Sequence, residues 1–232
     1  GHPARNGRAR IMSGYYLSAT MLDSFLLWER FDWLTTGDLV KRLTRQYDDT
    51  PALQRDVGTA AHWSLEPDSW ATDGVYVCPR TGHRIDAESA NAIKDTLPAD
   101  RIAEQTRYLK IGGHTVACKV DYAYGVSITD FKFRVPRPTK SGRPLQSPSP
   151  FDADKFSTAY QWRAYLAAWR ADEHVHEVIA AVDRGDGVYV LGERDTLRNY
   201  SYPGMFDDLR AVVTRVANFI DSQGLDVLHS KF

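Results

Sequence analysis

The feature that most constrains the fold is a run of alternating apolar and polar residues over 106–133, interrupted by turn signals. TRYLKI at 106–111 is followed by Gly112 and Gly113, a strong hairpin signal, and then by HTVACKVD at 114–121. YAYG at 122–125 predicts a turn into VSITDFKF at 126–133. This pattern predicts a meander of three antiparallel strands.

Segments with the apolar spacing of helices surround this β region. The expected helices cover 18–34, 37–47, 51–66, 86–96, 152–171 and 204–223. Further strands are expected at 75–78, 176–184 and 188–193, the last two joined through a hairpin turn, Gly185-Asp186-Gly187. This arrangement predicts an α/β fold with a mixed central β-sheet flanked by helices.

A chain of 232 residues can form one hydrophobic core, so a single domain is expected over 18–232. Residues 1–17 are expected to be a flexible basic N-terminal arm. Residues 134–150 contain five of the 11 prolines and four basic residues without an acid, which predicts a basic, Pro-rich loop. The net charge of −1 does not itself indicate a nucleic-acid partner, because a local basic patch matters more than the sum.

Asp130 and Lys132 lie on one face of the predicted strand 126–133, together with apolar residues. Charges on such a face are costly unless each is paired or binds a metal. Asp121 ends the preceding predicted strand, so its carboxylate and that of Asp130 could hold Mg²⁺ or Mn²⁺, which prefer oxygen ligands. Lys132 would then orient an attacking water whose pKa the metal lowers. The alternative is a plain Asp–Lys ion pair at a sheet edge.

Two further sets of residues have the spacing of one helix face. Gly58, His62 and Glu66 are each four residues apart, which makes His62 a candidate metal ligand. The alternative is a histidine satisfied in the core or on the surface. Gly58 within a helix suggests close packing or the close approach of a ligand. Gln161 and Tyr165 are also four residues apart; core packing is the alternative for Tyr165, and Gln161 needs a partner if it is buried.

In this order the motifs resemble those of the PD-(D/E)XK nuclease superfamily, in its RecB-like, phage-type exonuclease branch. GTAAHWSLE is similar to its G-x-x-x-H-x-x-L-E helix, VDYAYG to an Asp at a strand end, ITDFKF to its D/E-x-K strand, and QWRAYLAA to its Q-x-x-x-Y helix. The opening SATMLDSFLLWERF is similar to the helix that often begins such domains. The resemblance spans about residues 18–195 and implies a restriction-endonuclease-like core.

The resemblance implies a role for each motif residue. Asp121 and Asp130 would bind Mg²⁺ or Mn²⁺, helped by His62 and the backbone carbonyl of Phe131. Lys132 would position the nucleophilic water and offset charge on the phosphate, so Asp121, Asp130 and Lys132 are the expected catalytic residues.

Further residues are expected around this centre. Gln161 and Tyr165 would contact the substrate strand or brace the site. Arg134 and Arg137 would bind the backbone of the DNA strand, the alternative being a solvated, disordered loop. The accessory acidic candidates are Glu66 and Glu104.

The implied function is a metal-dependent DNA nuclease, an exonuclease, in DNA recombination and repair or phage DNA processing. The implied location is the cytoplasm of a bacterium or a phage-infected cell, and no membrane partner is expected. The chain lacks a G-x-x-x-x-G-K-[ST] phosphate loop, so a motor would be a separate helicase. The candidate protein partners are a single-strand annealing protein, such a helicase, and further copies of this chain.

Two observations limit the alternatives. With only Cys78 and Cys118, the chain cannot supply the four cysteines of an iron–sulfur cluster, so none is expected. A catalytically inactive DNA-binding or assembly module on the same fold is the main alternative, and a hydrolase of small molecules is a third. The complete set of acids, lysine and histidine favours the nuclease.

Overall fold

The computed structural model describes residues 14–46, 52–136 and 150–225. Its strands are β1 (Tyr16–Ser18), β2 (Val75–Val77), β3 (Arg84–Asp86), β4 (Ile102–Ala103), β5 (Thr106–Ile111), β6 (His114–Lys119), β7 (Tyr122–Tyr124), β8 (Ser127–Arg134), β9 (Glu173–Asp183) and β10 (Val188–Tyr200). Its helices are α1 (Ala19–Arg30), α2 (Thr36–Leu43), α3 (Leu53–Leu65), α4 (Ala87–Lys94), α5 (Pro150–Thr158), α6 (Gln161–Trp169) and α7 (Met205–Gln223).

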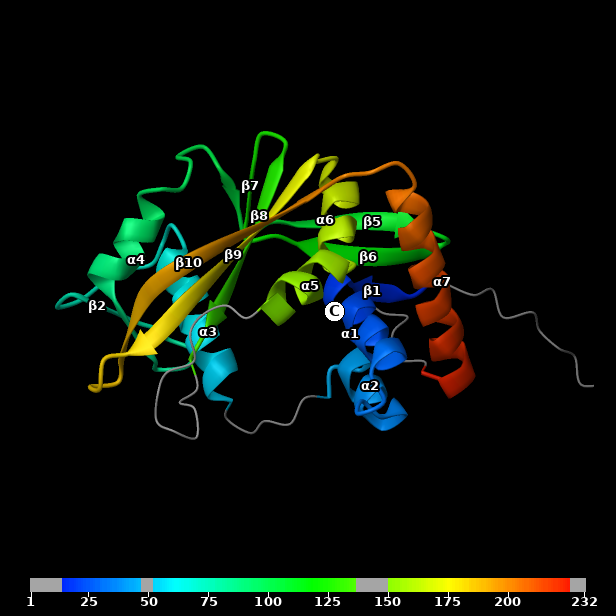
Figure 1. The fold of residues 1–232 in the computed structure, drawn as a ribbon, viewed down its shortest axis with the longest axis horizontal. Coiled ribbons are helices and arrows are strands. Elements are labelled where there is room, and N and C mark those ends of the chain that lie inside the picture. The colour runs from blue at the N-terminus through cyan, green and yellow to red at the C-terminus, as the bar shows by residue number, and fades with distance from the viewer. Residues whose placement is uncertain (1–13, 47–51, 137–149, 226–232) are drawn as a thin grey trace, which may run out of the picture.

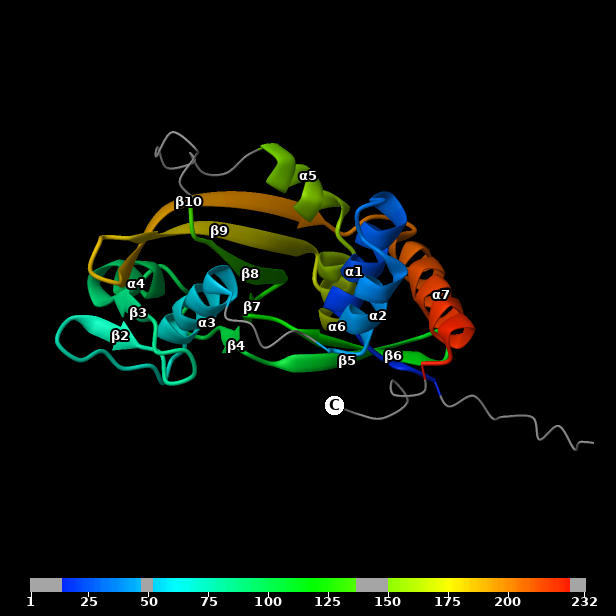
Figure 2. The same ribbon diagram turned by 90° about the horizontal axis from the view of Figure 1, so that it is seen from below.

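A mixed sheet flanked by helices forms the centre of the molecule, as predicted (Figure 1). Its seven strands lie in the order β2-β3-β10-β9-β8-β7-β4. Strands β8 and β9 pair in parallel, whereas β7 with β8 and β9 with β10 pair antiparallel. A separate three-stranded sheet has the order β1-β6-β5. The long strands β9 and β10 extend across the molecule in both ribbon views (Figures 1 and 2).

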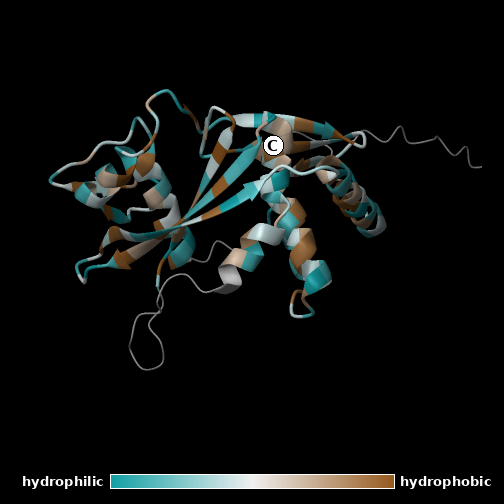
Figure 3. Ribbon diagram, turned by 45° about the horizontal axis from the view of Figure 1, so that its top comes forward, coloured by the Kyte–Doolittle hydropathy of each residue, from teal (hydrophilic) through white to brown (hydrophobic). Residues whose placement is uncertain are grey.

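Two hydrophobic clusters form the core, and β8 contributes to both. Ile128 belongs to the cluster formed mainly by α1, α6, α7 and the three-stranded sheet. Phe131 and Phe133, which point to the other face of β8, belong to the cluster formed with α3, α4 and the far end of the large sheet. This division follows from the alternation of side chains along a strand. Hydrophobic and hydrophilic residues alternate along the strands in Figure 3.

The expected three-stranded meander is wrong. The hairpin of β5 and β6 exists, but β6 does not pair with β8. The segment that was expected to be a turn instead forms β7, which pairs with β8 through a tighter turn at Gly125, where φ is 56°. The chain therefore passes from the small sheet to the large one between Lys119 and Tyr122, and Asp121 lies at this junction.

The helix expected over 152–171 is divided into α5 and α6, and a side chain from α1 explains the break. The Asp23 carboxylate accepts hydrogen bonds from the amides of Tyr160, at 2.5 Å, and Gln161, at 3.1 Å. It thereby satisfies amide groups at the start of α6. The Arg163 guanidinium donates to the Thr158 carbonyl at the end of α5, at 2.9 Å. The backbone groups at the end of α5 and at the start of α6 thus find side-chain partners, which they would not need if the helix were continuous.

Several other boundaries differ from expectation. Tyr16 and Leu17, which were assigned to the N-terminal arm, form β1 and pair in parallel with β6. Residues 1–13, Arg137 and most of the basic loop lie outside the described residues. Strand β10 continues through Tyr200, beyond its expected end, with a register shift between Leu191 and Arg194. None of the described helices is both long and apolar enough to cross a membrane.

Candidate active site

Strand β8 positions Asp130 and Lys132 on the same face, as the alternation predicted. The Lys132 ammonium forms an ion pair with Asp130 Oδ2. The Asp130 side chain is buried, with 6% of its surface exposed, and the Lys132 side chain retains 30%. On the neighbouring strand β9, His176 is in register with Asp130, and its Nδ1 lies 3.4 Å from the same carboxylate oxygen.

Asp121 reaches β8 from the junction between the two sheets. Its Oδ2 accepts a hydrogen bond from the Phe131 amide at 2.6 Å, which fixes the carboxylate beside the strand that carries Asp130 and Lys132. Its Oδ1 lies 3.6 Å from His62 Nδ1 on α3. The His62 ring contacts Phe133 edge-on, with the ring centres 4.9 Å apart.

Gln54 attaches α3 to the end of β8. Its amide nitrogen donates to the Phe133 carbonyl at 2.6 Å, and its amide oxygen accepts from the Val135 amide at 3.0 Å. This side chain extends the hydrogen bonding of the strand, much as a neighbouring strand would. Since His62 lies on the same helix, Gln54 also fixes the distance of His62 from β8.

The charges of the three central residues depend on one another. Burial and the nearby Asp130 carboxylate raise the pKa of Asp121 to about 8. Burial would raise the pKa of Asp130 too, but Lys132 and His176 outweigh it and hold that pKa below its ordinary value. Burial would lower the pKa of Lys132, yet Asp130 and Asp121 outweigh it and raise it. Asp130 and Lys132 are thus charged, and the carboxyl group of Asp121 lies where a further cation would favour its ionised form.

His62 is held in its neutral form. Burial and the nearby Lys132 ammonium lower the pKa of His62 to about 4. A neutral imidazole is the form of histidine that can ligate a metal.

The metal-ligand set expected from the sequence is only partly assembled. Within the described parts of the chain, no three His, Cys, Asp or Glu side chains are grouped so that they could hold a metal ion. His62 is close to Asp121, but the Asp130 carboxylate is turned toward Lys132 and His176. The donor chemistry, two carboxylates with one neutral imidazole, nevertheless fits a hard divalent cation in kind.

Gln161 and Tyr165 contact each other at the start of α6. The Gln161 amide nitrogen donates to the Tyr165 hydroxyl at 2.7 Å, and both side chains are buried. Burial, reinforced by the nearby Asp130 charge, raises the pKa of Tyr165 well above its ordinary value. Tyr165 is therefore part of the core, as the alternative interpretation held, and Gln161 has the partner that its burial requires.

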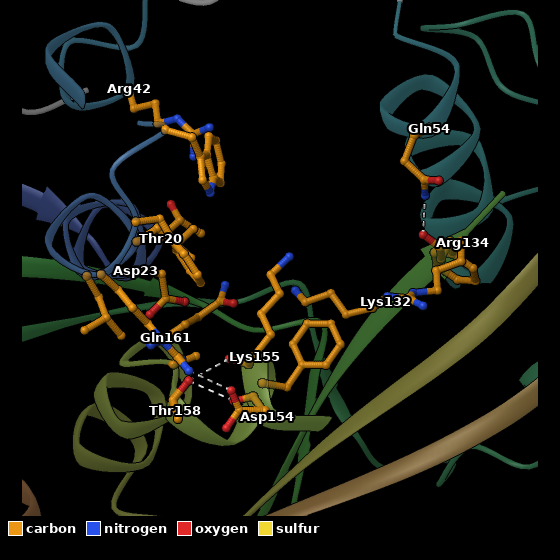
Figure 4. A pocket seen from close by; sticks show the side chains of 18 of the residues that line it. Thr20, Asp23, Arg42, Gln54, Lys132, Arg134, Asp154, Lys155, Thr158 and Gln161 are labelled. Carbon is orange, nitrogen blue, oxygen red and sulfur yellow. Dashed lines mark hydrogen bonds and ion pairs between the residues drawn. The ribbon is translucent and has the colours of Figure 1, made fainter. Parts of the chain in front are cut away.

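Two hollows lie beside these residues. A small recess of about 20 Å³ is lined by His62, Asp121 and Phe131, and by both accessory acids, Glu66 and Glu104. Glu104 forms an ion pair with Lys119. A much larger cavity of about 840 Å³ is lined by Lys132, Arg134 and Gln161 (Figure 4). The candidate centre thus lies between a narrow recess and a wide cavity.

The structure adds two residues that were not singled out from the sequence. His174 and His176 are fully buried on β9, and their rings lie 4.4 Å apart. Apart from the approach of His176 Nδ1 to Asp130 Oδ2 at 3.4 Å, none of their ring nitrogens has a polar partner among the described residues. The HVH spacing at 174–176 was a signal in the sequence, since on a strand it puts both imidazoles on one face, and in the structure His176 is opposite Asp130.

The close packing suggested for Gly58 is not found. A Cβ atom at this position would meet nothing within 4 Å, so neither packing nor the close approach of another group within the described structure requires a glycine.

No protein-family model matches the chain, and a sequence search of curated proteins finds no match. Similar solved structures include a candidate exonuclease of Eubacterium rectale, at 13% identity and a TM-score of 0.46, which covers 95% of this chain and 85% of that one. LHK-Exo, an alkaline exonuclease of Laribacter hongkongensis, was solved with dAMP. It is similar at 13% identity and a TM-score of 0.44, over 91% of this chain and 89% of that one. These overlaps are loose, and the case for a function rests on the side chains described above.

Proposed function

We propose that this chain is a divalent-metal-dependent DNA nuclease with a PD-(D/E)XK active site, in which Asp121, Asp130 and Lys132 are the catalytic residues. The observation that carries the proposal is the convergence of these three side chains beside a neutral His62, two of them from within β8 and Asp121 from the junction before β7. A plain ion pair between Asp130 and Lys132 would not require a second buried carboxylate whose pKa is raised to about 8.

The ion would be Mg²⁺ or Mn²⁺, bound by Asp121 and Asp130 with His62 and the Phe131 carbonyl. A bound divalent cation supplies a water of lowered pKa and stabilises charge on the phosphate. Lys132, charged and partly exposed to the large cavity, would hold that water by its ammonium group and offset the negative charge of the phosphate. Gln161, braced by Tyr165, would face the substrate strand from the opposite wall of the cavity.

The exonuclease assignment and a role in recombination, repair or phage DNA processing follow from the sequence resemblance. The same source suggests a separate helicase or annealing protein as a partner. The restriction-endonuclease-like core belongs to this proposal as well, since β7, β8 and β9 would be its catalytic strands.

The test is cleavage of end-labelled DNA with Mg²⁺, with Mn²⁺ and with EDTA. Asp121→Asn keeps an oxygen that can accept the Phe131 N–H but removes the charge that a divalent cation needs. We expect it to lose roughly 100-fold or more of the activity. The matched control is Glu88→Gln, which removes an exposed acid on α4 that lines neither hollow. Circular dichroism would check that each variant is folded.

Cleavage by Asp121→Asn at the wild-type rate would refute the proposal. Binding of DNA by the wild-type protein without cleavage in either metal would instead support the inactive binding module. Labels placed on the 5′ or the 3′ end, together with closed circles, would separate exonuclease from endonuclease action, since circles resist an exonuclease.

A further inference from the structure

The large cavity beside Lys132 has walls from distant parts of the chain. Helix α1 and the residues after it form one wall, and the end of β8 forms another. Helix α5 closes it from a third side (Figure 4). Its volume of about 840 Å³ lies at the upper end of the range for pockets that enclose a ligand. Because Lys132 belongs both to this cavity and to the candidate active site, whatever fills the cavity lies next to the reacting groups.

The cavity carries an excess of positive charge. Five cationic side chains line it, against two acids. The cations are Arg30, Arg42, Lys132, Arg134 and Lys155, and the acids are Asp23 and Asp154.

Lys132 is already paired with Asp130, and neither acid that lines the cavity balances Arg42 or Lys155. Asp154 is paired with Arg30 at 3.0 Å, and Asp23 accepts the amides at the start of α6. Neither Arg42 nor Lys155 forms an ion pair with an acid in the part of the chain that the structure describes. In Figure 4, Lys155 points into the cavity near Lys132, and Arg42 approaches from the opposite wall. A polyanion is the occupant that this charge favours.

The cavity also presents aromatic surface. Trp33 lines it with 66% of its surface exposed, and its ring lies 6.1 Å from that of Phe31, which lines the same wall. Phe133 and Phe156 lie on the other walls. An exposed indole next to cations is the combination that binds single-stranded nucleic acid, where bases stack on aromatic rings and phosphates contact Lys or Arg. Inside a duplex the faces of the bases are stacked on one another, so only its terminal pairs offer a face to Trp33.

We propose that this cavity binds single-stranded DNA next to the reacting phosphate, with Trp33 stacked on an unpaired base and Arg42 and Lys155 on the backbone. This inference rests on the proposed nuclease function and extends it, because it makes an unpaired strand the form of DNA that enters the active site.

Binding can be measured without cleavage by fluorescence anisotropy in EDTA. The ligands are a labelled thymidine strand of about 12 nucleotides, within the site sizes of single-strand-binding proteins, an abasic strand of the same length, and a blunt duplex. The variants are Trp33→Ala, Trp33→Phe and Arg42→Ala. The matched controls are Trp70→Ala, which removes an equally exposed indole (65%) outside the cavity, and Arg84→Ala on β3.

We expect Trp33→Ala to weaken binding of the thymidine strand by about 10-fold, and Trp33→Phe to restore most of it. On the abasic strand the effect of Trp33→Ala should vanish, because no base is left to stack. Arg42→Ala should weaken binding of both strands. It should also reduce the slope of log K against log salt concentration by about the value of one phosphate contact. Both control variants and duplex binding by Trp33→Ala should match the wild-type protein.

The inference is overturned if Trp33→Ala binds the thymidine strand as tightly as Trp70→Ala does, or loses the same factor on the abasic strand. Absence of any strand binding by the wild-type protein would overturn it too. Its failure is distinguishable from failure of the proposed function. If the wild-type protein cleaves DNA but the variants bind the strand normally, only the cavity proposal fails. If Trp33 contributes to binding through the base but the wild-type protein does not cleave, only the proposed nuclease function fails.

Discussion

Removing Lys132 from its ion pair with Asp130 should lower the free energy of unfolding more than removing Asp130 does. Lys132→Met leaves the buried Asp130 carboxylate with only His176 nearby on β9. Removing one partner of a buried pair typically costs about 3–5 kcal/mol. Because Lys132 is itself 30% exposed, water already screens part of the interaction, and we expect the lower end, about 3 kcal/mol.

The opposite change should cost less. Asp130→Asn leaves the Lys132 ammonium partly in water and still attracted to Asp121, so we expect a loss of about 1–2 kcal/mol, close to that of a hydrogen bond to a charged group. The double variant carries neither charge. Its loss should therefore be smaller than the sum of the two single losses, by roughly 1 kcal/mol or more.

Urea unfolding at pH 7 in EDTA, followed by tryptophan fluorescence, measures these differences. The matched control is Lys119→Met at the end of β6, which breaks the ion pair with Glu104; the Lys119 side chain is 62% exposed. That change should cost less than about 0.5 kcal/mol. A loss in Lys132→Met no larger than in the control, or a double variant equal to the sum of the singles, would refute the reasoning.

Two further predictions concern buried carboxyl groups. Burial and Asp130 raise the pKa of Asp121 to about 8, above its unfolded value of 3.8, so the folded protein holds a proton that the unfolded chain releases. The free energy of unfolding in EDTA should therefore fall as the pH rises from 3.8 to about 8. Asp121→Asn should make the urea midpoint less dependent on pH over this range. An equal slope in the variant and the wild-type protein would contradict the prediction. Asp23→Ala removes the acceptor at the start of α6 and should cost about 2 kcal/mol in the same assay. The neighbouring control, Ser24→Ala, should cost much less, and equal losses would contradict the role of Asp23.

Local pattern was sufficient to predict part of the site. The alternation along 126–133 predicted that Asp130 and Lys132 share a face, and that Phe131 and Phe133 lie on the other. The same reasoning predicted the mixed sheet and a helix that begins near residue 86, where the Asp86 side chain accepts a hydrogen bond from the Ser89 amide. These features depend on residues close in the sequence, so their period and turn chemistry carry the information.

The remaining features depend on contacts between distant residues. The break between α5 and α6 requires Asp23, about 137 positions upstream, whose side chain replaces hydrogen bonds that a continuous helix would make internally. The pairing of β7 with β8, instead of β6 with β8, is decided by which sheet can bury both faces of β8. No local period distinguishes these pairings. The same holds for His176, whose position against Asp130 follows only from the register of β9.

The single strand β8 belongs to both hydrophobic clusters, through Ile128 on one face and Phe131 and Phe133 on the other. Neither cluster can therefore separate from the other without breaking this strand. The two halves of the molecule should unfold as one cooperative unit, and the amides around Asp130 should exchange their hydrogens only when the whole protein opens. Asp130 and Lys132, two of the three residues proposed for catalysis, should thus lie on the most persistent segment of the backbone, so that a destabilising change in either half reduces the population of molecules with an intact site.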